Sequence, residues 1–238
     1  MDKTIENYLT RNDYPELKPK AVFFDMDGVL FDSMPYHSVA WVRAMNESGL
    51  SFTEKEAYMF EGQPGADTVN YLYQKKHGCD SSEEERTAIY NLKGKYFDEL
   101  GEPIRMPYAF EILQKLKEKG LMLFVVTGSA HPTLIDNIQH YFPGIFAVEN
   151  IISAFDVPKG KPNPDPYLKA LHKAAVQPWE AVVVENAPLG VKSSSTARIF
   201  TIGVNTGPLD RNVLTENGAD VVLDSMQELF EKWDSFGF

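Results

Sequence analysis

The stretch AVFFDMDGVLFDS, residues 21 to 33, begins like a buried strand and ends in an unusual way. Four apolar residues lead directly into Asp25, Met26 and Asp27, and Gly28 follows. Because side chains on a strand alternate with a period of two, Asp25 and Asp27 point in the same direction. Two neighbouring carboxylates repel each other, so the pattern is either an aspartate-rich turn closed by Gly28 or a site that needs both charges. The rest of the chain decides between these two interpretations.

Short apolar runs rich in strand-forming residues recur along the chain and indicate one sheet. They are AVFF at 21–24, LMLFVVT at 121–127, NIISAF at 150–155, AVVVE at 181–185, FTIGV at 200–204 and DVVL at 220–223. Runs that are apolar throughout are typical of strands covered on both faces. Helical patterns separate most of them, as in residues 108–120, where Phe110, Leu113 and Leu116 share one face. This alternation predicts an α/β fold with a doubly wound parallel sheet.

The interval from about residue 34 to 104 breaks this alternation, because it holds helical patterns and no convincing strand. One of these patterns opens with Ser82 and Glu85 at the spacing of a capping box. We therefore expect an all-helical cap domain at 34–104, inserted between a first part of the core at 1–33 and a second part at 105–238. The first 20 residues are consistent with a short packed helix or with a frayed end.

Composition narrows the class of protein. The chain has 238 residues, a net charge of −11 and a single cysteine, Cys79. The acidic charge argues against binding to nucleic acid or to anionic membranes, and no apolar run approaches the roughly 18 residues of a membrane span. One cysteine excludes an internal disulfide and suits a reducing compartment. We expect a cytoplasmic protein without a signal peptide, and a monomer.

Polar groups follow four successive strands. Asp25 to Gly28 follow the first, and Thr127, Gly128 and Ser129 follow the second. KGKPNPDPY, with Lys161, follows the third, and Glu185 and Asn186 end the fourth. Each group alone has an ordinary structural explanation, such as a helix cap, a solvated lysine or an Asx turn. Ligands of open α/β sheets bind beyond the carboxyl ends of the strands, where these groups would converge.

The chemistry of the four groups is complementary. Carboxylate and amide oxygens from Asp25, Asp27, Glu185 and Asn186 suit Mg²⁺, which would also explain why two aspartates can sit together. Hydroxyls and backbone N–H groups around Gly128 suit phosphate oxygens, and Lys161 supplies a positive charge for the same group. The set predicts phosphoryl transfer on a small phosphorylated substrate.

At this point the sequence resembles the haloacid dehalogenase superfamily of aspartate-nucleophile phosphotransferases, and within it the β-phosphoglucomutase-like branch. FDMDGVLFDS, VVTGS, KGKPNPDPY and VVVENAPLGV match the four family motifs in order. The resemblance covers roughly residues 20 to 225 and implies the Rossmann-like core of that superfamily with a helical cap. SMPYHSVAW, EAYMFEG and NTGPLD look especially similar to an inorganic pyrophosphatase of that branch.

The resemblance implies a role for each motif residue. Asp25 would be the nucleophile that forms an aspartyl-phosphate, and Asp27 the general acid and then the base. Thr127 and Ser129 would bind phosphate, and Lys161 would neutralise charge. Asp25, the carbonyl of Asp27 and the acidic fourth motif would hold Mg²⁺. That motif often has two acids, but here the second is Asn186, which can ligate through its amide oxygen with one charge fewer.

The expected cap bears on substrate choice. By resemblance, His37 faces the site from the first cap helix, and Glu61 lies in a cap loop that reaches it. Sugar-phosphate mutases of this branch place basic residues in and near that loop, whereas this chain has EGQPG at 61–65. The leading hypothesis is a Mg²⁺-dependent hydrolase of pyrophosphate or a small phosphate ester. The alternatives are a β-phosphoglucomutase, a non-catalytic phosphate-binding domain and, last, a haloacid dehalogenase.

Overall fold

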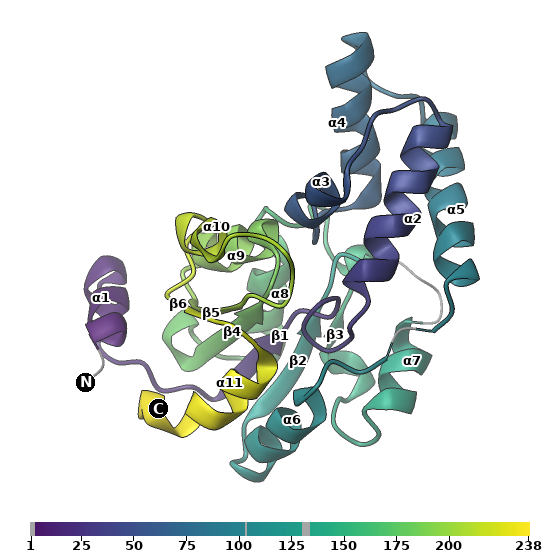
Figure 1. Ribbon diagram of the computed structural model, residues 1–238. Coiled ribbons are helices and arrows are strands. Elements are labelled where there is room, and N and C mark those ends of the chain that lie inside the picture. Colours follow the sequence, from purple (N-terminus) through teal and green to yellow (C-terminus); the bar gives the residue numbers. More distant parts are fainter. Residues whose placement is uncertain (1–2, 103, 130–133) are drawn as a thin grey trace.

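The computed structural model describes residues 3–102, 104–129 and 134–238, and within them it contains one six-stranded parallel sheet (Figure 1). The strand order is β3-β2-β1-β4-β5-β6. The strands are β1 Ala21–Phe24, β2 Met122–Val126, β3 Ile151–Ile152, β4 Ala181–Glu185, β5 Phe200–Val204 and β6 Val221–Leu223. The predicted doubly wound α/β fold is confirmed. Strand β1 lies between β2 and β4, so its carboxyl end is at the centre of the sheet edge.

Helices cover both faces of the sheet. One face carries α6 Ala109–Glu118, α7 Leu134–Tyr141 and α11 Met226–Lys232, and the other carries α8 Asp165–Ala174, α9 Pro188–Thr196 and α10 Arg211–Glu216. Alternate residues of β1 enter different cores: Val22 and Phe24 pack on the first side, and Ala21 and Phe23 on the second. All four are fully buried, as an apolar run through a two-sided sheet requires.

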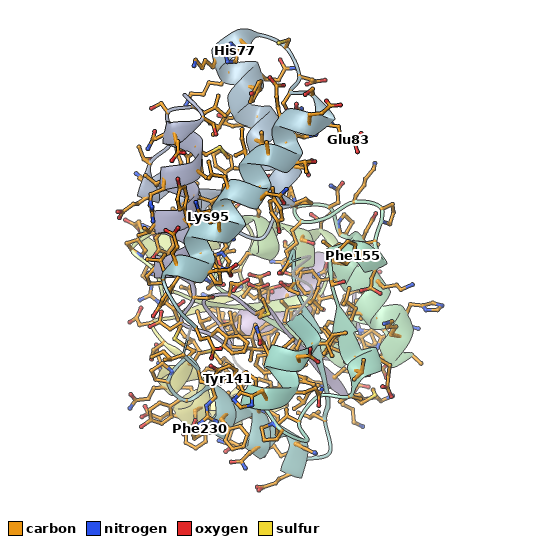
Figure 2. The ribbon with its side chains drawn as sticks, turned by 90° about the vertical axis from the view of Figure 1, so that its right-hand side faces the viewer. His77, Glu83, Lys95, Tyr141, Phe155 and Phe230 are labelled. Carbon is orange, nitrogen blue, oxygen red and sulfur yellow. The ribbon has the colours of Figure 1, made fainter. Side chains whose placement is uncertain are left out.

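A separate layer of helices stands over the carboxyl end of the sheet. We call residues 34–100 the helical insert; it contains α2 Met34–Glu47, α3 Glu54–Met59, α4 Gly65–His77 and α5 Glu83–Glu99. These helices share their own apolar cluster, which includes Met45, Val69 and Ile89. Figure 2 shows His77 and Glu83 at the end of the insert that points away from the sheet. The domain limits of 34 and 104 stay a prediction.

Local capping fixes where the helices of the insert begin. Ser82 accepts a hydrogen bond from the backbone N–H of Glu85, and Glu85 accepts one from the N–H of Ser82, so the predicted capping box is confirmed. Thr53 and Glu56 form a second box at the start of α3. These reciprocal bonds satisfy N–H groups that a helix cannot pair internally.

The two ends of the insert run side by side. The N–H of Asp32 donates to the carbonyl of Ile104 at 2.9 Å, and the N–H of Met106 donates to the carbonyl of Leu30 at 2.9 Å. This short pairing connects the insert directly to the turn that carries Asp25 and Asp27. A displacement of the insert therefore acts close to that turn.

The N-terminal segment forms a packed helix, α1 Lys3–Asn12, rather than a frayed end. Tyr8 is fully buried, and its hydroxyl donates to the carbonyl of Arg198 at 3.0 Å. Arg11 pairs with Asp220 at 2.8 Å. Both partners lie in the C-terminal part of the chain, so the periodicity of residues 3–12 alone could not predict this packing.

One strand is shorter than predicted. The run at 150–155 contributes only Ile151 and Ile152, because the hydroxyl of Ser153 accepts from the N–H of Phe155 and turns the chain into a 3₁₀ turn at Ala154–Asp156. Within the described residues, no helix is long and apolar enough to cross a membrane.

Candidate active site

The turn after β1 presents Asp25 and Asp27 at the centre of the sheet edge. Leu30 and Phe31 donate their N–H groups to the carbonyl of Met26 at 2.8 and 3.1 Å, which closes the turn. Gly28 has φ +82°, a left-handed conformation that glycine adopts without a steric penalty. Asp25 is almost fully buried, whereas the side chain of Asp27 keeps 18% of its exposure. The turn therefore places one carboxylate in the floor of the site and the other at its opening.

Lys161 lies beneath Asp25 and is fully buried. Its Nζ donates to Asp25 Oδ1 at 2.6 Å, to Glu185 Oε1 at 2.6 Å and to the carbonyl of Val126 at 2.9 Å. Burial, followed by the charge of Glu185, raises the pKa of Asp25 to about 7, although Lys161 opposes the shift. One ammonium thus serves two carboxylates that would otherwise be buried without a cation.

Asp27 is held by polar side chains from residue 33 and from the helical insert that follows it. Ser33 Oγ donates to Asp27 Oδ1 at 2.6 Å, and His37 Nε2 lies 3.1 Å from the same oxygen. Lys93 Nζ lies 2.7 Å from His37 Nδ1. Burial would raise the pKa of Asp27, but His37, Ser33 and Lys93 lower it to about 2. The two aspartates therefore have very different proton affinities.

The loop after β2 brings backbone and hydroxyl groups to the same opening. The N–H of Ser129 donates to Thr127 Oγ1 at 3.0 Å, which holds the loop in a tight turn. A Cβ on Gly128 would lie 2.4 Å from the carbonyl oxygen of Gly62 in the helical insert. Glycine is required at 128 because the backbone of the insert approaches this closely.

Glu61 reaches from the helical insert to the sheet. Asn186 Nδ2 donates to Glu61 Oε1 and Oε2 at 3.2 and 3.3 Å. Burial, and then the charges of Asp25, Asp27 and Glu185, raise the pKa of Glu61 well above its usual range. The insert thus adds a fourth carboxyl group to the site, and its surroundings favour the neutral form of that group.

The residues present fit a bound cation. Asn186 Oδ1 is buried and, among the described residues, has no hydrogen-bond partner. Its residue follows Glu185 directly and contacts Glu61 through Nδ2, and a divalent ion would remove the repulsion among the carboxylates of the site. No three His, Cys, Asp or Glu side chains of the described residues converge as a preformed metal site. A site built from one carboxylate, a backbone carbonyl and an amide oxygen, as expected for Mg²⁺, falls outside that pattern.

The structure brings the predicted site residues together around one cavity of about 80 Å³. Seven of them line it: Asp25, Asp27, His37, Glu61, Thr127, Gly128 and Ser129. The cavity is not lined by the other three predicted site residues, which are buried: Lys161, Glu185 and Asn186. Both oxygens of Glu185 are engaged, Oε1 by Lys161 and Tyr167 and Oε2 by the N–H of Ala187 at 3.1 Å. Its predicted role as a metal ligand stays a prediction.

Three contributors were missed at the level of sequence. Ser33 and Lys93 support Asp27 and His37, and Tyr167 donates to Glu185 Oε1 at 2.7 Å. Tyr167 does end the motif KGKPNPDPY, which was a usable signal. No sequence signal marked Lys93, because a lysine in a helix is ordinarily exposed. Here the lysine is buried, and its Nζ lies 4.8 Å from the ring centre of Phe97.

The comparison with known families agrees with this geometry. The family model described as haloacid dehalogenase-like hydrolase matches residues 22–204, which include the four motifs and the helical insert. The chain belongs to this family. Haloacid dehalogenase-like phosphatases generally use Mg²⁺.

Individual relatives place the chain near the β-phosphoglucomutase-like branch. A solved structure from Bacteroides vulgatus, provisionally named a β-phosphoglucomutase, is 48% identical with a TM-score of 0.96 and covers 99% of this chain and 96% of its own. Hexitol phosphatase A of Escherichia coli is 30% identical, over 90% of this chain and 94% of that protein. The β-phosphoglucomutase of Bacillus subtilis is 22% identical, over 90% and 96%. The predicted family and branch are confirmed.

Proposed function

We propose that this protein is a Mg²⁺-dependent phosphohydrolase that acts through an aspartyl-phosphate on Asp25, with inorganic pyrophosphate as its leading substrate and small phosphate esters next. The observation that carries the proposal is the pair Asp25 and Asp27. One is buried on Lys161 and the other is held by His37 at the opening of the same cavity. Two carboxyl groups at one cavity, one against a buried ammonium and the other beside an imidazole, are the parts that a covalent nucleophile and a separate proton carrier need.

The proposed reaction has two steps. In the first, the negative charge of the bound phosphate raises the low pKa of Asp27, so that this carboxyl takes up a proton. An oxygen of Asp25 then bonds to phosphorus, the bond from phosphorus to the leaving oxygen breaks, and the leaving group takes the proton from Asp27. In the second, water gives a proton to Asp27 and attacks the same phosphorus, and the bond to Asp25 breaks. His37, 3.1 Å from Asp27, orients this carboxyl and shares its proton.

The chain's own residues would hold the metal and the transferring group. We assign Mg²⁺ to Asp25, the backbone carbonyl of Asp27 and the fourth motif, with Asn186 Oδ1 as its best-supported side-chain ligand because that oxygen is buried and unpaired. The ion supplies positive charge for the transferring phosphoryl group. Thr127 and Ser129 would bind phosphate oxygens, and Lys161 would balance the charge of Asp25.

Substrate size and charge support pyrophosphate. The carboxylate of Glu61 projects from the insert towards the catalytic aspartates. Among the described residues that line the cavity there is no arginine, and the lysine present, Lys93, is turned to His37. A mutase must hold a second phosphate on its sugar, and this cavity offers it little positive charge. A compact diphosphate can instead keep both phosphates near the metal and Lys161.

A β-phosphoglucomutase is the second candidate, and the similarity to the Bacteroides vulgatus structure favours it. In that reaction the aspartyl-phosphate would pass its phosphate to a sugar rather than to water. Neither candidate needs a nucleic acid or a membrane. A monomer in the cytoplasm stays part of the proposal and rests on the composition alone.

A steady-state screen tests the proposal. It measures kcat/KM with Mg²⁺ and with chelator for pyrophosphate, hexitol phosphates, glucose 6-phosphate and β-glucose 1-phosphate. We expect the highest value for pyrophosphate and loss of all turnover with chelator. Faster interconversion of the two glucose phosphates than hydrolysis of pyrophosphate would replace the hydrolase proposal with the mutase.

A further inference from the structure

The segment NTGPLD, residues 205–210, follows β5 and takes no part in the chemistry described above. Its backbone is nevertheless firmly held. The N–H of Asn205 donates to the carbonyl of Leu223 at 2.7 Å, and Asn205 Nδ2 donates to the carbonyl of Leu209 at 3.1 Å. These hydrogen bonds, to β6 and within the loop itself, make residues 205–210 a rigid support for the elements that pack on them.

The nucleophile turn rests on this loop through Thr206. Thr206 Oγ1 donates to the carbonyl of Gly28 at 2.6 Å. On its other side Gly28 packs against Asn186, because a Cβ at Gly28 would lie 2.0 Å from Asn186 Nδ2. Gly28 is thus held between Thr206 and Asn186, and it follows Asp27 directly. A change at Thr206 would therefore reach both the carbonyl and the amide proposed to hold the metal.

The helical insert rests on the same loop through the next residue. A Cβ on Gly207 would lie 3.1 Å from Cδ1 and Cε1 of Tyr58, which is closer than such contacts ordinarily are. Tyr58 belongs to α3, the helix of the insert that lies nearest to α9 and α10 in Figure 1. Tyr58 precedes Glu61 by three residues. The absence of a side chain at 207 thus determines how closely α3, and with it Glu61, approaches the sheet.

We propose that Thr206 and Gly207 are positioning residues that set the nucleophile turn and the helical insert from one rigid loop. Thr206 holds Gly28, and through it Asp27 and Asn186, in the arrangement that binds the metal. Because Gly207 has no side chain, the ring of Tyr58 can pack against it, and Glu61 can then contact Asn186. The inference rests on the proposed function for its chemistry, but its two contacts are open to measurements that need no turnover.

Thr206→Val tests the first contact, because it removes the hydroxyl and keeps the shape of the side chain. The primary measurement is the dissociation constant of Mg²⁺ by titration calorimetry, and the second is the division of any rate loss between kcat and KM. We expect Mg²⁺ binding weaker by about 3- to 10-fold, as for the loss of one hydrogen bond, and a similar fall in kcat with little change in KM. Thr206→Ser should recover most of both.

Thr215→Val is the matched control, since Thr215 is exposed on α10 and its change should leave Mg²⁺ binding as in the wild type. If Thr206→Val binds Mg²⁺ as tightly as the control, Thr206 is a structural residue only and this half of the inference fails. Thermal unfolding of each variant separates a weaker fold from a displaced turn.

The second contact is tested with Gly207→Ala, Tyr58→Ala and the double variant. The exposed Cys79 lies in the insert, and Glu118→Cys on α6 provides a second label on the core, so their separation reports the position of the insert. We expect Gly207→Ala to shift the label distances to longer values. The shift should vanish in the Tyr58→Ala background, because the ring that the new Cβ meets is gone.

Gly94→Ala in α5 is the control, because a Cβ there has nothing within 4 Å. Unchanged label distances in Gly207→Ala, or a shift that persists without the ring of Tyr58, would overturn the proposed role of Gly207. If the wild type hydrolyses none of the phosphates, the proposed function fails while the Mg²⁺ and label measurements still decide this inference.

Discussion

Replacing Lys161 with methionine tests how the site holds its charges. Lys161 Nζ lies 2.6 Å from both Asp25 Oδ1 and Glu185 Oε1, and the lysine side chain has no exposure. Methionine has similar bulk but leaves two buried carboxylates without their cation. Removing one partner of a buried ion pair costs about 3–5 kcal/mol. In a protein of this size 1 kcal/mol moves Tm by about 2–4 °C, so we expect Tm to fall by roughly 6–20 °C.

The assay is thermal unfolding in the presence of chelator at neutral pH, compared with Lys75→Met. Lys75 pairs with Glu56 at 3.2 Å on the surface, with 57% of its side chain exposed, so its loss should cost less than about 1 kcal/mol. Saturating Mg²⁺ should restore part of the stability of Lys161→Met, because a cation again lies near the carboxylates. A Tm for Lys161→Met no lower than that of the Lys75→Met control would refute the reasoning.

Three further predictions concern the metal site and the cavity. Asn186→Asp should tighten Mg²⁺ binding in a calorimetric titration, because it adds a charge at the buried, unpaired ligand position; weaker binding would show that residue 186 is not a ligand. Glu61→Ala should reduce the preference for pyrophosphate over glucose 6-phosphate, mainly by slowing pyrophosphate hydrolysis, and unchanged kcat/KM ratios would make Glu61 an ordinary loop residue. Burial lowers the pKa of Lys93 to about 8, so kcat should decline as the pH rises through that value and Lys93 loses the charge that supports His37. Lys93→Arg should move this decline to higher pH, and a profile identical to the wild type would exclude Lys93 as its cause.

The fold was largely predictable because its signals are local. The period-two spacing of Asp25 and Asp27 and the apolar run before them are properties of one short segment. The same holds for the capping box of Ser82 and Glu85, whose spacing alone fixes the start of α5. Helix α1 was left open, because its support comes from Tyr8 reaching Arg198. A contact across such a separation leaves no periodic trace in the sequence.

The candidate site was predictable where its groups end strands. The carboxyl ends of parallel strands meet at one edge, so Asp25, Thr127 and Glu185 could be brought together from order alone. Lys93 and Thr206 could not, because their roles depend on how the insert and the loop after β5 are placed over the turn. The engagement of both oxygens of Glu185 was not predicted, although Ala187 follows it by two residues and Tyr167 ends the motif KGKPNPDPY.

The most direct test of the central proposal is to trap the phosphate on Asp25. Rapid acid quench of the first turnover with radiolabelled pyrophosphate and Mg²⁺ should give protein-bound label, mapped by peptide analysis to Asp25 and removed by hydroxylamine. Asp27→Asn should both form and lose the label more slowly, because Asp27 is the acid of the first step and the base of the second, and Asp25→Asn should show none. Release of phosphate in the first turnover without any label on the protein, or label that persists in Asp25→Asn, would contradict the proposed mechanism.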